Sequence, residues 1–207
     1  MSTSGINPNM MVSNIDISSM DLETALMTVQ SERTRLLDAQ LADQIKAVQN
    51  RNDQIAKLNN VLSGLTQAQG LFPSDAKATD NLDSTGDGAW RKDQSWPLER
   101  QVNTALIEAG MTSPGLQTVG PALTNSVDEN GNAVMLDGGI RGFTTKGDLE
   151  AMITKVKGMI DGESNSQQMD MLRLQSMSNK RNEAFDVMTN FVKKMQDSRS
   201  SIIGNMR

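Results

Sequence analysis

The sequence predicts a mainly α-helical fold, in which long N-terminal and C-terminal helices form an antiparallel hairpin or coiled coil with a small irregular insert. Three observations support this prediction. Apolar residues recur at heptad spacing in both end segments, as in coiled coils. Both segments lack proline, whereas every proline after Pro8 and most glycines fall within residues 70–145. A chain of 207 residues is also long enough to bury a core.

The chain divides into four predicted parts. They are a tail (1–18), a long helix (19–68), an inserted small domain (69–145) and a C-terminal helical region with heptads (146–207). The tail is rich in Ser, Thr, Asn and Ile, and it lacks the basic and apolar regions of a cleaved secretory signal. It is either an ordinary flexible tail or an uncleaved export signal of another kind, and composition alone favours the first.

The long helix, residues 19–68, has a start signal and an apolar seam. Ser18 and Asp21 stand at capping-box spacing just where the helix is predicted to begin. The seam consists of Leu41, Ile45, Val48, Ile55 and Leu62. Asn52 and Asn59 occupy the remaining seam positions. A buried Asn there fixes the register of a coiled coil, and an exposed one marks a segment where the seam turns towards solvent.

The insert is predicted to contain one short helix and a β-hairpin. Ser95 suits the helix cap, Pro97 suits the first turn, and Gly110 suits the stop. The Asn130–Gly131 pair is a signal for a tight hairpin turn with short flanking strands. We interpret the insert as a small domain or an ordered long loop.

The C-terminal region begins with a second capping box, formed by Thr145 and Asp148. The polar run at residues 161–166 is predicted to interrupt or bend the helix. The last helix then carries a heptad seam, whose apolar members are Met171, Leu174, Phe185, Met188, Val192, Met195, Ile202 and Met206. A second stripe contains Met177, Ala184, Val187 and Phe191. Two stripes are more than one antiparallel partner needs, so we expect contacts with a further partner.

Composition narrows the function. The chain has no Cys and no His, which removes disulfides, thiolate chemistry and zinc-type sites. A net charge of −5 argues against a nucleic-acid binder. No run is apolar and long enough to span a bilayer directly. Nucleotide-binding and hydrolase motifs are missing from the sequence. We therefore expect no enzyme, no cofactor and no metal.

The charges are unevenly distributed along the chain. Residues 1–32 contain four acidic residues and no Lys or Arg, whereas residues 173–207 contain seven basic and three acidic residues. Antiparallel pairing of the end segments brings these opposite charges together. Methionine is abundant, with 15 residues, eight of them from Met152 onward. Met fills gaps in cores, and it is also common at adaptable partner surfaces.

Two segments of the insert begin like calcium loops. Residues 83–94 have carboxylates at the first and fifth positions, but Gln94 replaces the bidentate acid at the last. Residues 128–139 end on Gly139 instead of an acid. Both are predicted to be turns. Trp90 and Trp96 are either a ligand-contacting pair or part of the core of the insert.

The run LQSMSNKRNEAF, from Leu174 to Phe185, resembles the C-terminal helix of type III secretion filament and needle-tip subunits of the EspA type. In that family a Gln-x-Met-Ser-Asn run opens the final coiled-coil helix, as Gln175, Met177, Ser178 and Asn179 do here. The ending SSIIGNMR is similar in style to the tail of those subunits. The order of a tail, a long helix, a variable insert and a C-terminal helix also agrees.

The resemblance implies a secreted structural subunit with a concrete set of partners. It implies export through an uncleaved N-terminal signal, after a cytoplasmic secretion chaperone has held the chain. It then implies assembly at the needle tip on the bacterial surface into a helical homopolymer. Such a filament contacts the needle subunit and serves as a conduit for translocator proteins to the host membrane. The alternative is a monomeric helical-hairpin adaptor or chaperone-like binding module. The weakest hypothesis is a metal-dependent enzyme built on the insert.

Overall fold

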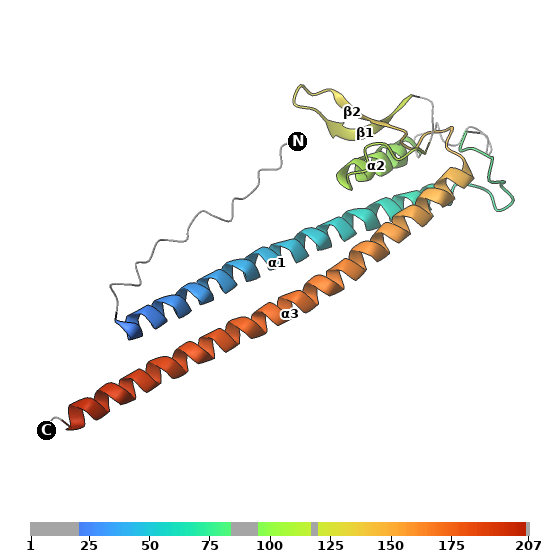
Figure 1. The fold of residues 1–207 in the computed structure, drawn as a ribbon. Helices are drawn as coiled ribbons and strands as arrows, with labels where there is room; N and C mark the ends of the chain where they lie inside the picture. The colour runs from blue at the N-terminus through green and yellow to red at the C-terminus, as the bar shows by residue number, and fades with distance from the viewer. Residues whose placement is uncertain (1–20, 84–94, 117–119, 206–207) are drawn as a thin grey trace. The chain divides into compact units, whose positions relative to one another are not determined.

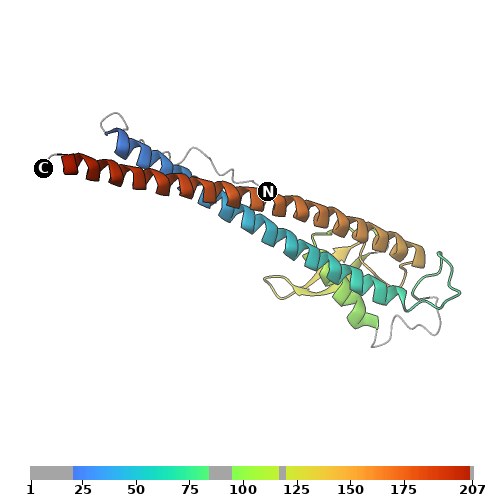
Figure 2. The same ribbon diagram turned by 90° about the horizontal axis from the view of Figure 1, so that it is seen from below.

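The structure, a computed structural model, describes residues 21–83, 95–116 and 120–205 of the chain. Its elements are α1 (Leu22–Gln69), α2 (Ser95–Glu108), β1 (Pro121–Val127), β2 (Ala133–Asp137) and α3 (Lys146–Asn205). The two long helices α1 and α3 pack together, as Figures 1 and 2 show. The short helix α2 and the hairpin β1–β2 form the insert. The predicted mainly helical fold with a small insert is confirmed.

The described residues fall into two compact units by their internal contacts. The two-helix unit consists of the described residues up to Gln44 and those from Arg173 onward. The insert unit consists of the described residues within Ile45–Leu172. Both long helices contribute to both units, but only the insert unit contains α2 and the hairpin.

Asp21 caps the N-terminus of α1. Its carboxylate accepts hydrogen bonds from the Thr24 backbone N–H and from the Thr24 hydroxyl, both at 2.9 Å. The first of these bonds satisfies an N–H that the helix leaves without an intrahelical partner. Both lower the pKa of Asp21, the backbone bond most. Ser18, the other predicted member of the capping box, lies outside the described residues.

The predicted capping box at the start of α3 is confirmed. The Thr145 hydroxyl accepts from the Asp148 N–H at 3.1 Å, and the Asp148 carboxylate accepts from the Thr145 N–H and hydroxyl. From Lys146 the helix runs to Asn205 without a break. The interruption predicted at residues 161–166 is therefore not observed. The segment contains no proline, and its Glu163 is bonded to Arg51 of α1.

The helix α2 begins and ends where the sequence predicts. Gly110, with φ of 81°, adopts the left-handed conformation that ends many helices. The Gly110 N–H donates to the Ile107 carbonyl and the Met111 N–H donates to the Leu106 carbonyl, both at 2.8 Å. This bond pattern is a Schellman motif. Met111 and Leu106 are both buried, so the motif also brings the chain back to the core.

The predicted hairpin is present, but its connection is longer than a two-residue turn. The strands β1 and β2 are antiparallel, and Leu123 lies opposite Met135. Residues 128–132 connect them, with Gly131 at a φ of 80°. The Asp128 carboxylate accepts from the backbone N–H groups of Asn130 and Asn132. These bonds hold the connection together and make it a side-chain-supported turn.

The apolar core lies in the insert unit. It gathers residues of α1, α2, the hairpin and the start of α3. Its fully buried large side chains include Leu58, Val61, Leu65, Val102, Leu106, Leu136, Ile140, Leu149 and Val156. At Gly64 the helices α1 and α2 come so close that a Cβ there would lie 2.7 Å from Val102 Cγ2. The single glycine within α1 is thus the point where the insert packs onto the helix.

Asn103 joins three parts of the insert from inside the core. Its side chain is fully buried, and its amide donates to the carbonyls of Leu123 and Ile140 at 2.9 and 3.1 Å. Its Oδ1 accepts from the Ile140 N–H at 2.8 Å. The buried amide is therefore hydrogen-bonded through both of its polar atoms, as a buried polar group must be. It fixes α2 against β1 and against the segment that follows β2.

Candidate interaction surface

The two-helix unit consists of α1 and α3 alone, held in antiparallel register by side-chain contacts. Arg181 Nε donates to Asp38 Oδ1 at 2.5 Å, and Arg199 pairs with Glu23 at 3.2 Å. The second pair joins the acidic beginning of the chain to its basic end. Because these side chains are well exposed, such pairs contribute little to stability. They define the register without supplying a core.

The interior of this unit is small and partly polar. Its buried side chains are Ala25, Thr34 and Ala184. Thr34 donates its hydroxyl to the Gln30 carbonyl within the same helix. Every Leu, Ile, Val, Met and Phe whose side chain is described in this unit keeps part of its surface accessible. Two helices packed on alanine and threonine bury little apolar area, so the unit gains little hydrophobic stabilisation by itself.

The predicted interaction residues of α3 divide into two groups. Leu174, Met177, Met188, Phe191, Val192 and Met195 are half-buried. Met171, Phe185 and Ile202 are exposed. Met206 lies outside the described residues. The most buried position of α3 in this unit is Ala184, from the second stripe, so the α1-facing side combines members of both predicted stripes.

The predicted seam residues of α1 differ in how far they are buried. Val48 is buried, Leu41, Ile55 and Leu62 are half-buried, and Ile45 is exposed. Asn52 and Asn59 are both exposed. Asn59 bonds only to the Ile55 carbonyl of its own helix, so this position faces outward and holds no partner in register.

The sequence reasoning missed the residues that form the core face of α1. They are Leu58, Val61 and Leu65, all fully buried. Their three-four spacing is itself a heptad signal, displaced by one residue from the seam that we counted. It is the face that α2 covers, since Gly64 of this stretch lies against Val102.

Exposed apolar side chains gather on both helices of the two-helix unit. On α1 they are Leu26, Met27, Val29 and Leu36, and on α3 they are Phe185, Val187, Ile202 and Ile203. Leu36 is 50% exposed and Ile203 is 67% exposed. The Arg181 guanidinium lies 5.7 Å from the centroid of the Phe185 ring while it also bonds to Asp38. This cation–π contact holds the ring on the surface. Large exposed apolar patches mark interaction sites.

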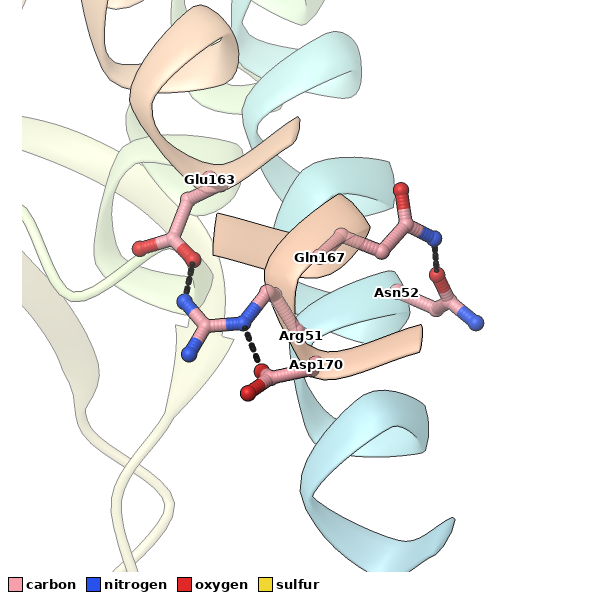
Figure 3. A network of polar contacts seen from close by, with 5 residues as sticks. All are labelled: Arg51, Asn52, Glu163, Gln167 and Asp170. Atoms are coloured by element: carbon pink, nitrogen blue, oxygen red, sulfur yellow. Dashed lines mark hydrogen bonds and ion pairs between the residues drawn. The ribbon is translucent and has the colours of Figure 1, made fainter. Parts of the chain in front are cut away.

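Polar contacts replace apolar ones at the middle of the helix pair in the insert unit (Figure 3). Arg51 of α1 bonds to Glu163 at 2.6 Å and to Asp170 at 2.8 Å, and Asn52 bonds to Gln167. The Asp170 side chain is only 14% exposed. The hydrogen bonds that Arg51 donates, first to Glu163 and then to Asp170, raise the pKa of its guanidinium. The network explains how α3 stays helical through its polar run.

The remaining candidate sites are the tryptophans and the calcium-like loops of the insert. Trp96 is 51% exposed, so it is not part of the core, and it lines an open hollow of about 290 Å³ with Leu123 and Phe143. Trp90 and most of the calcium-like loop at residues 83–94 lie outside the described residues. Among the residues that the structure describes, no group of three acidic side chains could hold a metal ion. No described helix combines the length and apolarity needed to cross a bilayer.

We call Leu26, Met27, Val29 and Leu36 of α1 and Phe185, Val187, Ile202 and Ile203 of α3 the exposed rows of the two-helix unit. They are the most distinctive surface among the described residues. Comparison with family models, with curated proteins and with solved structures finds no match to this chain.

Proposed function

We propose that the chain is a structural subunit that assembles with further copies of itself through the exposed apolar rows of its two-helix unit. The observation that carries this proposal is the small interior of that unit, where Ala25, Thr34 and Ala184 are the only buried residues among the side chains that the structure describes. Eight large apolar side chains among the described residues of the same unit stay exposed. Additional helices packed against these rows would remove that apolar area from water, which is the main driving force of association.

The two rows lie on different helices, which favours an extended assembly. Contacts between unlike surfaces are heterologous, and a rotation that does not close on itself yields a helical filament. The Met27 and Met177 side chains suit such contacts, because Met adapts its shape to a partner. The insert unit has its own core and would decorate this assembly without taking part in the helix contacts.

The resemblance of residues 174–185 to needle-tip and filament subunits gives the proposal its biological setting. The resemblance implies that the subunit is secreted by a type III system and forms a filament at the needle tip. Its partners are the needle subunit, translocator proteins and a cytoplasmic chaperone before export. The uncleaved export signal then lies in the first 18 residues. These assignments rest on the sequence resemblance, and the exposed rows support the self-assembly itself.

The test is a pair of substitutions at two exposed apolar positions of α3. Phe185→Asp together with Val187→Asp places two charges where a neighbouring copy would pack. The control is Asn182→Asp with Asn190→Asp, which changes the charge equally at exposed polar positions of the same helix. Negative-stain electron microscopy and sedimentation velocity should show filaments for the control and monomers for the first variant. Normal filaments from Phe185→Asp/Val187→Asp would overturn the proposal.

The second candidate function, a monomeric adaptor, follows from the same surface. An exposed apolar row also fits a helix of another protein. Purified protein that stays monomeric at every concentration would favour this adaptor over self-assembly. The substitutions above would then abolish binding to that partner and leave the monomer unchanged.

A further inference from the structure

The outer edge of β2 is an open strand edge, whereas the outer edge of β1 is covered by α2. The Leu123 carbonyl accepts from the Asn103 amide and the Asn125 N–H donates to the Thr104 hydroxyl at 2.8 Å. Both side chains belong to α2, which lies on the β1 side of the hairpin in Figure 1. No hydrogen bond from any described segment outside the hairpin reaches the backbone of Ala133, Met135 or Asp137.

The ladder determines which backbone groups of β2 face outward. Leu123 lies opposite Met135, and its carbonyl points away from β2 towards Asn103. In an antiparallel pair, opposite residues direct their N–H and C=O groups alike, either both inward or both outward. Met135 therefore directs its N–H and C=O to the free edge. Alternation along the strand assigns the same direction to Ala133 and Asp137. Val134 between them faces inward, since its carbonyl accepts from the Thr124 hydroxyl at 2.6 Å.

The free edge lacks the devices that usually block strand addition. Residues 133–137, AVMLD, contain no Lys and no Pro. The bulge in the hairpin lies in β1, between Leu123 and Val127, and leaves β2 regular. Met135 is also 51% exposed on the face that it shares with Leu123. A two-stranded sheet with an exposed apolar face and an open edge is a template for a further strand.

We propose that the added strand is β2 of a second copy, paired antiparallel about Met135. The strand is complementary to itself in this register. Met135 then lies opposite the same residue of the other copy, and Asp137 lies opposite Ala133. Parallel pairing in register would instead bring the two Asp137 carboxylates side by side, which is unfavourable. The charges of the strand thus select the two-fold antiparallel arrangement, which is a self-complementary interface.

The result is a four-stranded sheet in the order β1–β2–β2–β1. The apolar face would become one continuous row, in which the exposed Leu123 and Met135 of each copy lie side by side. This contact uses the insert and none of the exposed rows of the two helices. It therefore goes beyond the proposed helix-mediated assembly, and in a filament it would join subunits laterally.

The first test uses the absence of Cys from the chain. In the proposed pair the two Met135 Cα atoms lie about 5.5 Å apart, within the range that a disulfide bridges. Val127, 66% exposed on β1, is the control, because three strand spacings, about 14 Å, separate the two β1 strands. The full chain with Met135→Cys should oxidise to a disulfide-linked dimer at least about tenfold faster than the chain with Val127→Cys. Equal rates, or no dimer from Met135→Cys, would overturn the proposal.

Both Cys variants are made in the Phe185→Asp/Val187→Asp background, so helix-mediated assembly does not bring the inserts together. Their circular dichroism and thermal unfolding should match the parent, which shows that the hairpin is intact. A dimer in this background separates the two proposals, because it survives the loss of filaments. Met135→Lys gives a second readout. It places two cations opposite each other and should shift sedimentation to the monomer, whereas Val127→Lys should leave the dimer unchanged.

Discussion

The two units of the molecule are built from the same two helices, yet only one of them has a core. In the insert unit α1 contributes Leu58, Val61 and Leu65, all fully buried against α2 and α3. In the two-helix unit the deepest side chains are two alanines and one threonine. The difference comes from the third layer, since α2 and the hairpin cover the helix pair only in the insert unit. A helix pair without a third layer leaves apolar area for a partner.

The largest expected effect comes from comparing a buried leucine of the insert unit with an exposed leucine of the two-helix unit. Leu106→Ala removes a fully buried side chain of α2 and should lower the free energy of unfolding by about 2–5 kcal/mol. Leu36→Ala, at a position 50% exposed in the two-helix unit, should change it by less than about 0.5 kcal/mol in dilute monomer. Chemical denaturation measures both. Similar losses for the two variants would contradict the division into a packed and an open unit.

Two helical glycines test the close contact of α1 and α2. Gly64→Ala brings a Cβ to 2.7 Å from the stiff Val102 side chain, so overpacking of about 1–3 kcal/mol should outweigh the gain in helix propensity. Gly158→Ala is the matched control. A Cβ there meets nothing within 4 Å, so this change should stabilise the protein by about 1 kcal/mol. Thermal unfolding would show opposite shifts, and a rise for both variants would rule out the tight contact.

The ion network of the insert unit should matter more than the exposed pair of the two-helix unit. Arg51→Met removes the guanidinium that bonds to Glu163 and Asp170 and should lower the free energy of unfolding, because Asp170 is mostly buried. Arg35→Met breaks the exposed pair with Glu32 and should lower the free energy of unfolding much less. Urea denaturation compares them. The expectation fails when the Arg35 variant loses as much stability as the Arg51 variant.

The smallest effect concerns acid at the start of the two-helix unit. The bonds from Thr24 lower the pKa of Asp21 below its ordinary 3.8, so the charged carboxylate stabilises the folded helix. That stabilisation is present above pH 3.8 and is lost as the pH falls through the lower folded value. The protection factor of the Thr24 amide against hydrogen exchange should therefore fall on acidification. Asp21→Asn removes the titration at that site, and unchanged pH dependence in this variant would contradict the assignment.

Local signals predicted the helix ends well, because the chemistry of a cap is contained in neighbouring residues. Thr145 with Asp148 and Gly110 after α2 form the predicted motifs. The core face of α1 could not be predicted in the same way. A seam counted from Leu41 competes with one through Leu58 and Leu65, and the choice depends on where α2 packs. The position of α2 is a long-range property that no local pattern contains.

The continuity of α3 shows the same limit. Residues 161–166 have weak helix formers, and their propensity predicted an interruption or a bend. The bonds of Glu163, Gln167 and Asp170 to a helix more than 100 residues earlier override that local preference. For the candidate surface, the periodicity predicted that α3 carries more apolar residues than one partner helix can cover. It did not predict which stripe α1 would cover, because Ala184 is a weaker signal than its larger neighbours.

The core of the insert unit also has a consequence for how the chain folds. The two-helix unit closes a loop of well over 100 residues, and the contacts of Ala184 and Thr34 return little free energy for that closure. The core cluster that contains Leu65, Leu149 and Val156 closes a shorter loop and buries much more apolar area. Once this cluster has formed, each further turn of the two helices can pair at little cost in chain entropy. Folding should start at the insert and zip towards the chain ends, and unfolding should begin at those ends.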